Sequence, residues 1–146
     1  AADHKANFCI GVAGYPEKHI EAPSLTSDLA RLKEKIEAGA DYVVTQMFFD
    51  NQKYFEFVDK AREAGINVPI IPGIKPIAVK KHLNLLSQAF KIDFPQELVE
   101  AVEACKHNAD VKQIGIEWAI QAGIPVLHYY SMGKSDNIVK VISEVF

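Results

Sequence analysis

The sequence predicts an α/β protein in which parallel strands and helices alternate four times, with one extra helix before the fourth strand. Apolar runs of strand length occur at residues 8–13, within 37–50, at 68–71 and at 125–129. The stretches between them carry apolar residues at helical spacing, and each is long enough for a right-handed crossover. The sheet should therefore be parallel. Four such units make half of a (β/α)8 TIM barrel, and a small open parallel sheet with helices on both faces is the alternative.

Composition indicates a globular chain that could form a single domain of four βα units over residues 1–146. The chain has 49% hydrophobic and 24% charged residues and a net charge of -3. This charge gives no broad attraction to nucleic acid or to anionic membranes, and no stretch resembles a signal peptide or a membrane span. We expect a cytoplasmic protein. Cys9 and Cys105 lack CxxC spacing, so we expect buried, inert thiols.

The first βα unit is predicted over residues 8–39. The apolar strand at 8–13 ends at Gly14, and a polar loop with Tyr15 and His19 follows it. Ser24, Thr26 or Ser27 can cap the next helix, which Gly39 ends. Its inner face is expected to carry Leu29, Leu32 and Ile36.

The second strand, within residues 37–50, is the stretch around which the sheet is expected to form. Its apolar run predicts burial on both faces, and Thr45 and Gln46 stand at its carboxyl end. Polar residues at that end of a parallel strand are typical of a ligand crevice. Gln46 is therefore the first functional candidate, and the alternative is an amide that only caps a neighbouring loop.

The remaining elements follow the same alternation. A helix capped by Asn51 precedes the strand at 68–71, and residues 72–76 (PGIKP) predict a rigid turn. Two further helices should be separated by a break at residues 106–110 from a helix that ends at Gly123. The strand at 125–129 and a last helix, capped by Ser135 or Asp136, complete the pattern. The expected inward residues of these five helices, in order, are Tyr54, Phe55, Val58 and Ala61; Val79, Leu83, Leu86 and Phe90; Leu98, Val99, Val102 and Cys105; Val111, Ile114 and Trp118; and Ile138, Val141 and Ile142.

Polar and aromatic residues follow all four strands. Because parallel strands point the same way, these residues should converge on one rim. Aromatic and amide groups there could hold a flat heterocycle, and lysines with a helix amino end could hold phosphate. No dinucleotide fingerprint, P-loop, carboxylate pair or Ser/His/Asp set is evident, and the scattered histidines do not indicate a metal site. The converging residues are Tyr15, His19, Thr45, Gln46, Lys75, His128, Tyr130 and Lys134.

Four ordered blocks in this sequence closely resemble the carboxyl-terminal half of the catalytic domain of methylenetetrahydrofolate reductase. They are GVAGYPEKHIEA, AGADYVVTQMFFD, VPIIPGIKP and LHYYSMGK. The resemblance implies a flavin-dependent (β/α)8 barrel of one-carbon metabolism and methionine biosynthesis. In this family NADH or NADPH reduces FAD, and the reduced flavin passes a hydride to 5,10-methylenetetrahydrofolate, giving 5-methyltetrahydrofolate.

The resemblance also assigns site residues by position. His82 and Leu86 stand where the family often has glutamine and phenylalanine, and Lys134 replaces a frequent arginine, which keeps the charge without the planar fork. Gln46 matches the glutamine that meets both folate and nicotinamide. The implied FAD contacts are Tyr15, His19, Ala22, Asp28, Arg31 and Lys35, and the implied substrate contacts are Gln46, His82, Leu86, Tyr130, Met132 and Lys134.

The family's first four βα units have no counterpart in this sequence. They carry the glutamate thought to act as general acid, an aspartate near the flavin N1 and a loop that grips the diphosphate. The helix before the last strand is also shorter than the family pattern by about ten residues. We therefore expect weak or no reductase activity from this segment alone, and self-association into a homo-oligomer through free strand edges. The alternative is a non-catalytic half-barrel scaffold or an engineered fragment.

Overall fold

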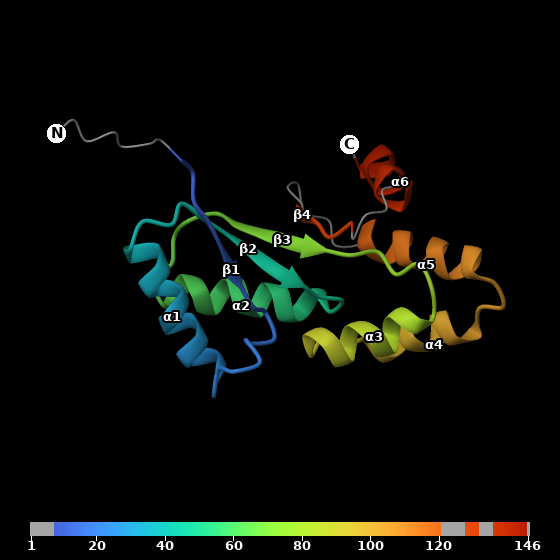
Figure 1. Cartoon of the computed structure of the whole chain (residues 1–146), viewed down its shortest axis with the longest axis horizontal. Coiled ribbons are helices and arrows are strands. Elements are labelled where there is room, and N and C mark those ends of the chain that lie inside the picture. The colour runs from blue at the N-terminus through green and yellow to red at the C-terminus, as the bar shows by residue number, and fades with distance from the viewer. Residues whose placement is uncertain (1–7, 121–127, 132–135, 146) are drawn as a thin grey trace.

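A computed structural model describes residues 8–120, 128–131 and 136–145 of the chain. Its four strands form one sheet in the order β1–β2–β3–β4, and each neighbouring pair is parallel (Figure 1). The predicted parallel α/β class is confirmed. The strands are β1 (Gly11–Gly14), β2 (Tyr42–Met47), β3 (Ile70–Ile74) and β4 (His128–Tyr129).

Helices connect the strands as the crossover pattern requires. Ser24 caps α1, because its side chain accepts a hydrogen bond from the Ser27 N–H while the Ser27 side chain accepts one from the Ser24 N–H. Asp50, rather than the expected Asn51, caps α2, since its side chain accepts from the Gln52 N–H at 2.9 Å. No helix in the described ranges has the length and apolar character needed to cross a bilayer. The helices are α1 (Leu25–Glu37), α2 (Asn51–Glu63), α3 (Lys81–Phe90), α4 (Gln96–Ala104), α5 (Asn108–Ile120) and α6 (Asp136–Val145).

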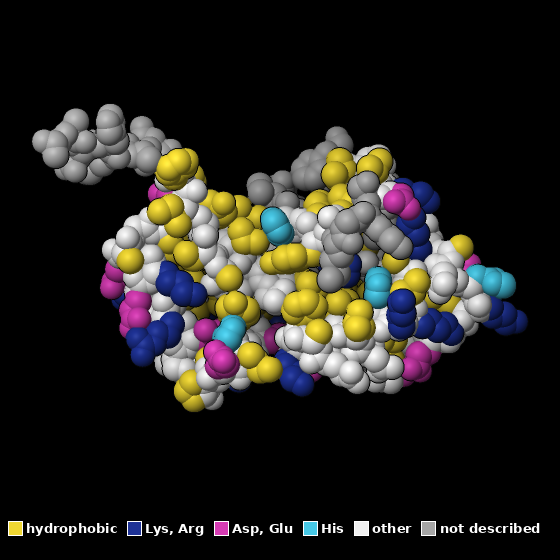
Figure 2. Space-filling model, viewed as in Figure 1, with side chains coloured by type: hydrophobic (Ala, Val, Ile, Leu, Met, Phe, Trp, Pro, Cys, Tyr) yellow, Lys and Arg dark blue, Asp and Glu magenta, His cyan; other side chains and the backbone are white. Residues whose placement is uncertain are grey.

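Along β2 the core lies on one face of the sheet. Along β2 the side chains alternate, so that Val43, Thr45 and Met47 are buried while Tyr42, Val44 and Gln46 are only half-buried. Burial of this strand on both faces was therefore a wrong prediction. Hydrophobic side chains are also visible at the surface, over the strands in the middle of the molecule (Figure 2). A strand whose buried side chains lie on one face fits half of a barrel. A small open parallel sheet would have the same strand order. The buried core residues form three clusters: Leu29, Leu32, Val43, Phe57, Ala61 and Ile66; Ile74, Ile116, Ala119 and Val141; and Met47, Phe49, Ile77, Leu86, Ile92, Leu98, Val102 and Val111.

The first strand begins later and is more exposed than expected. It starts at Gly11, and Phe8 and Ile10 are 80% and 52% exposed. Among the described strands β1 has one neighbour only, and its leading residues contact the chain at the start of β2 through backbone bonds, such as that from the Asp41 N–H to the Ile10 carbonyl at 2.8 Å. Cys9 is exposed too, which corrects its expected burial, and Cys105 is half-buried with its thiol donating to the Ala101 carbonyl at 3.3 Å.

The inner face of α2 also differs from the expectation. Phe55 is 49% exposed, whereas Phe57 is 1% exposed and lies in the core. The buried positions Tyr54, Phe57 and Ala61 are three and four residues apart, so they form a single stripe on the helix. Phe55 falls off that stripe, because a step of one residue turns the helix by about 100°.

The third strand runs through the segment that was expected to turn. It spans Ile70–Ile74 rather than residues 68–71, so Pro72 and Gly73 lie within it. Pro72 has no N–H to donate to a neighbouring strand, and the Gly73 N–H donates to the Thr45 side chain instead of a backbone carbonyl.

Helix boundaries in the second half also shift. α5 starts at Asn108, inside the expected break at 106–110, and the carboxylate of Asp110 accepts from the His107 N–H at 3.3 Å. Val79 precedes α3, which begins at Lys81. The expected helix end at Gly123, the start of the strand at 125–127 and the cap Ser135 lie outside the described residues.

Candidate functional site

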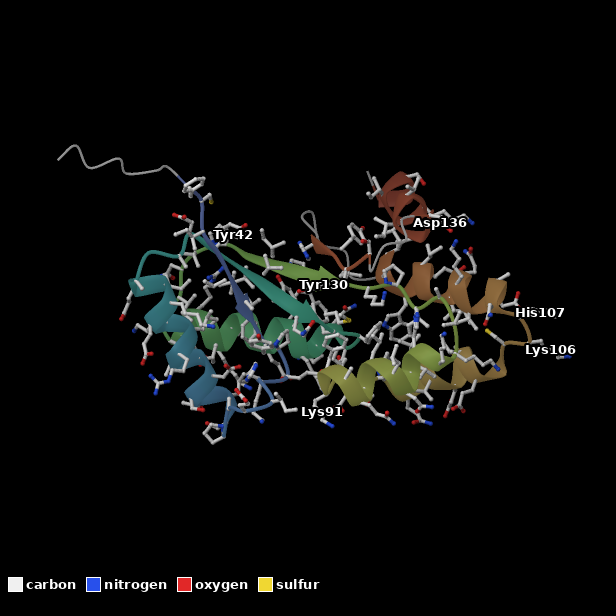
Figure 3. All side chains as sticks on the ribbon, in the orientation of Figure 1. Tyr42, Lys91, Lys106, His107, Tyr130 and Asp136 are labelled. Carbon is white, nitrogen blue, oxygen red and sulfur yellow. The ribbon has the colours of Figure 1, made fainter. Side chains whose placement is uncertain are left out.

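The carboxyl ends of the strands meet at one edge of the sheet. Gly14 pairs with Thr45, Met47 with Gly73, and Ile74 with Tyr129. Tyr15, Gln46 and Tyr130 therefore lie at the same edge. Figure 3 labels Tyr130 near the end of β3 and Tyr42 at the opposite end of β2.

A bulge in β2 fixes Tyr130 at this edge. The register between β2 and β3 shifts between Val44 and Met47. Side chains replace the lost ladder bonds: Thr45 Oγ1 accepts from the Gly73 N–H at 2.9 Å, and the Tyr130 hydroxyl donates to the Thr45 carbonyl at 2.9 Å. A bulge commonly redirects side chains next to a site, and here it frees one carbonyl for the tyrosine.

Gln46 lies at the bulge, and the oxygen of its side-chain amide is hydrogen-bonded. Its side-chain oxygen accepts from the Met47 N–H at 3.0 Å, and its NH2 group has no hydrogen-bond partner among the described residues. The amide thus contacts the backbone of its own strand rather than a neighbouring loop, and it still has two donors for another group.

A groove of about 420 Å³ lies beside the end of β1, between the loop after that strand and α1. Its volume falls within the roughly 300–1,000 Å³ of small-molecule sites. All six residues that the resemblance assigned to FAD line this groove, although they come from two different elements. The full lining is Tyr15, His19, Glu21, Ala22, Pro23, Ser27, Asp28, Arg31 and Lys35.

Hydrogen bonds hold the aromatic wall of the groove. The rings of Tyr15 and His19 meet edge to face with centroids 4.7 Å apart. The His19 N–H donates to the Asp28 carboxylate at 2.9 Å, which ties the loop to the first turn of α1. Because His19 Nδ1 accepts from the Glu21 N–H at 3.2 Å, the neutral ring carries its hydrogen on Nε2 and can donate from there.

The two cationic side chains of the groove, Arg31 and Lys35, differ in whether they are free to bind an anion. Arg31 donates to both carboxylate oxygens of Glu34 at 2.8 Å, so this guanidinium must leave Glu34 before it can bind a phosphate. Lys35 forms no ion pair among the described residues. The role of Glu34 was missed at the sequence level, although its spacing three residues after Arg31 on a helix was the available signal.

The substrate residues expected beyond β3 are not all brought to this groove. His82 lines a separate groove with Lys75 and Lys81, and its Nδ1 accepts from the Ala78 N–H at 3.2 Å. Leu86 is 0% exposed in a core cluster with Ile77 and Ile92, so its expected ligand contact was wrong. The assignments to Met132 and Lys134 lie outside the described residues.

Lys75 is a buried cation without a carboxylate partner among the described residues. The residue is 7% exposed, and its ammonium donates to the Tyr130 carbonyl at 3.5 Å. Burial lowers the pKa of Lys75 from its ordinary value of 10.5. The folded state therefore holds this proton less strongly than the unfolded chain does.

Replacing Lys75 with methionine is expected to raise the free energy of unfolding at pH 7 by about 1 kcal/mol, because the burial cost of the charge disappears. The advantage over wild type should shrink as pH rises from the lowered folded pKa towards 10.5, where both states lose the proton. Urea unfolding at pH 7 and pH 10 measures this, with the exposed Lys81→Met as the matched control. A loss of stability in Lys75→Met would contradict the assignment and indicate an anionic partner for the ammonium.

This chain combines parallel βα units with a groove beside the strand ends. The same arrangement is typical of the class of α/β proteins that bind ligands at the carboxyl edge of the sheet. The family model of methylenetetrahydrofolate reductase matches residues 2–145. The chain belongs to the methylenetetrahydrofolate reductase family.

Curated relatives agree with this membership. A methylenetetrahydrofolate reductase (NADH) of Arabidopsis thaliana is 40% identical over 92% of this chain and 26% of its own length. A probable methylenetetrahydrofolate reductase (NADPH) of Caenorhabditis elegans is 36% identical over 94% of this chain and 22% of its own. The 5,10-methylenetetrahydrofolate reductase of Escherichia coli is 33% identical over 90% and 47%. The chain thus spans less than half the length of these relatives.

A solved structure supports the fold. A protein from Clostridium thermocellum, which binds two copies of 5-methyl-5,6,7,8-tetrahydrofolic acid, has a TM-score of 0.62 to this chain at 19% identity. The match covers 94% of this chain and 53% of that one.

Proposed function

We propose that this chain forms the part of a methylenetetrahydrofolate reductase that holds FAD and one side of the folate site. The main support for this proposal is the groove, which is lined by Tyr15, His19, Ala22, Asp28, Arg31 and Lys35. When bound, FAD would supply hydride chemistry, with NADH or NADPH as donor and 5,10-methylenetetrahydrofolate as acceptor. The names of the relatives include both donors, so this proposal leaves the choice of nucleotide open.

The residues of the groove fit the parts of such a cofactor. Lys35, and Arg31 once released from Glu34, offer positive charge to a diphosphate. The Asp28 carboxylate can accept from ribose hydroxyls with the oxygen that His19 leaves free. The Tyr15 and His19 rings give a flat heterocycle an aromatic wall.

Two groups at the sheet edge are proposed to hold the folate side. Gln46 would orient a pterin or nicotinamide through its NH2 group, which has no partner in the part of the chain that the structure describes. Tyr130 would form part of the same folate site as Gln46. Its hydroxyl donates a hydrogen bond to the Thr45 carbonyl, and this bond orients its ring. Proton delivery to the folate has no candidate among these residues, so reductase activity of this segment alone should be weak or absent.

Titration of the purified chain with FAD, followed by quenching of flavin fluorescence, tests this proposal. Lys35→Gln should weaken FAD binding about tenfold, or about 1.4 kcal/mol, because one charge-assisted contact to phosphate is lost. Riboflavin, which lacks the diphosphate, should be bound equally by wild type and variant.

The matched control is Lys33→Gln, which removes an exposed lysine from the same helix but outside the groove. An equal loss of FAD affinity in both variants would point to a general charge effect and against the groove. A wild-type chain that binds neither compound would overturn the proposal and favour a non-catalytic scaffold.

A further inference from the structure

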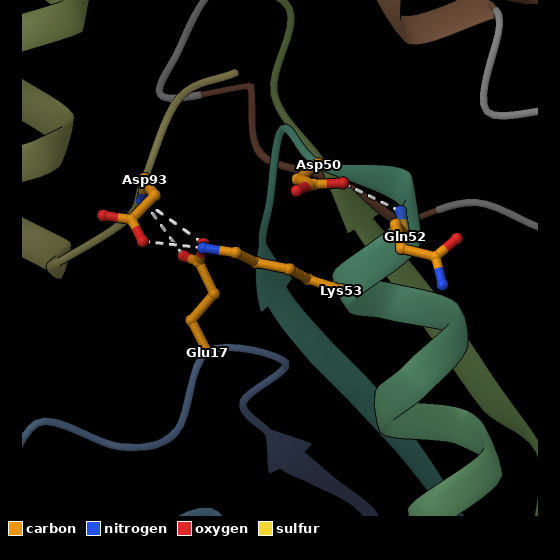
Figure 4. Close-up of polar contacts among 5 residues, drawn as sticks. All are labelled: Glu17, Asp50, Gln52, Lys53 and Asp93. Atoms are coloured by element: carbon orange, nitrogen blue, oxygen red, sulfur yellow. Dashed lines mark hydrogen bonds and ion pairs between the residues drawn. The ribbon is translucent and has the colours of Figure 1, made fainter. Parts of the chain in front are cut away.

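The middle of the loop that carries Tyr15 and His19 is fixed by an ion cluster outside the groove. Glu17 Oε1 accepts from the Lys53 ammonium at 2.7 Å, and the same ammonium donates to Asp93 Oδ2 at 2.6 Å (Figure 4). The Asp93 backbone N–H also lies 3.3 and 3.2 Å from the two oxygens of Glu17. These three residues are the Glu17–Lys53–Asp93 cluster.

The cluster joins three segments that are far apart in the sequence. Glu17 belongs to the loop between β1 and α1, Lys53 to the first turn of α2, and Asp93 to the connection between α3 and α4. Glu17 itself does not line the groove, whereas Tyr15 and His19, two residues away on either side, do. The cluster thus contacts the loop through a residue that does not itself line the groove.

Partial burial of Glu17 and Lys53 distinguishes this cluster from an ordinary surface ion pair, and it makes the loss of either partner costly. The Glu17 side chain is 12% exposed and that of Lys53 is 32% exposed. Burial raises the pKa of Glu17 above its ordinary value of 4.5, and the hydrogen bond and charge of Lys53 offset this rise only in part. Without Lys53, two carboxylates would share the site with no cation, and an uncompensated buried charge is costly. By contrast, Arg31 and Glu34 are 74% and 60% exposed, and such pairs contribute little.

The loop between β1 and α1 also contains backbone hydrogen bonds of its own, which form only while the loop keeps this conformation. The Lys18 N–H donates to the Tyr15 carbonyl and the Ala22 N–H to the His19 carbonyl, both at 3.0 Å. Lys18 has a φ of 72°, a left-handed conformation that a non-glycine residue adopts only when its surroundings hold it there. The hydrogen bond that the Lys53 ammonium donates to Glu17 supplies such a hold at the adjacent residue.

We propose that the Glu17–Lys53–Asp93 cluster positions Tyr15 and His19, so that Lys53 and Glu17 set the affinity of the groove without touching its ligand. The identity of the ligand as FAD rests on the proposed function, but the positioning role does not. Lys53 and Glu17 are thereby positioning residues, in addition to the groove residues already described.

Lys53→Met is the first test, read by amide hydrogen exchange in the free protein. Exchange of the Lys18 and Ala22 amides should become about fivefold faster or more, while the Val43 amide, bonded to the Pro69 carbonyl in the sheet, should change less. FAD affinity should fall about three- to tenfold, and Lys53→Arg should restore most of it, since arginine keeps the charge.

Lys112→Met is the matched control. It removes an ion pair to Asp136 with the same exposed fractions, 32% and 79%, as the pair of Lys53 with Asp93. It should leave loop exchange and FAD affinity unchanged. Should Lys53→Met fail to fold, the double variant Glu17→Gln/Lys53→Met takes its place with the same expected results, because it leaves no unpaired carboxylate at Glu17.

The outcomes separate this inference from the proposed function. Faster loop exchange in a chain that binds no FAD supports the cluster and counts against FAD. Unchanged loop exchange in Lys53→Met, or wild-type loop amides that already exchange at the unprotected rate, overturns the positioning role whatever the chain binds.

Discussion

Replacing Leu86 with alanine is expected to lower the free energy of unfolding by about 3 kcal/mol. Leu86 is fully buried and lies with Met47, Ile77 and Ile92 in one cluster, so truncation leaves a cavity as well as losing buried apolar area. Urea unfolding followed by circular dichroism measures the change.

The neighbouring Leu85 gives a matched control. It lies on the same helix but is 54% exposed, so Leu85→Ala should change stability by about 0.5 kcal/mol or less. If Leu86→Ala were as mild as Leu85→Ala, its place in the core would be wrong and a ligand contact would again be open. The expected difference therefore distinguishes a structural leucine from a folate-contacting one.

Gly73→Ala is expected to cost about 2–3 kcal/mol, because a side chain at this position has no space. An added Cβ would collide with the Thr45 carbonyl and would stand 2.5 Å from Tyr130 Cε2. The backbone oxygen cannot move without disturbing the bulge, so the tyrosine and β2 must both shift. Urea unfolding gives the cost, and the near-ultraviolet circular dichroism of the tyrosines should report the displacement.

Gly39→Ala separates crowding from backbone strain. Gly39 has a φ of 112° but no atom within 4 Å of an added Cβ, so alanine there should cost about 1 kcal/mol through conformation alone. Its tyrosine signal should match that of wild type. Equal costs at both positions, with no spectral change in Gly73→Ala, would contradict the close approach of Tyr130.

The alternation of strands and helices was predictable because each element carries its own periodic pattern. The end of β3 was not, since Pro72 and Gly73 are usual turn residues and only their neighbours keep them in a strand. The Thr45 side chain, which lies 28 residues earlier in the sequence, accepts the Gly73 N–H. Local preference was overridden by a tertiary contact that no short window of sequence contains.

The candidate groove was easier to anticipate than the cluster beneath its loop. Its six expected lining residues fall within one loop and one helix, so proximity along the chain already groups them. Lys53 and Asp93 are 36 and 76 residues from Glu17, and charged residues at such distances carry no mutual signal in a single sequence. Leu86 was misassigned for the opposite reason: the resemblance suggested a contact, while its helical spacing, which marked it as inward, was correct.

The strands at the two margins of the sheet, β1 and β4, have consequences for how this protein could be assembled. Each has one strand partner among the described residues, so its outer row of N–H and C=O groups is unmatched by a further described strand. Such a row can accept an extended segment through main-chain bonds alone. A separately expressed polypeptide with parallel strands could therefore join this one side to side, and the two pieces would make a natural starting point for a split-protein reporter.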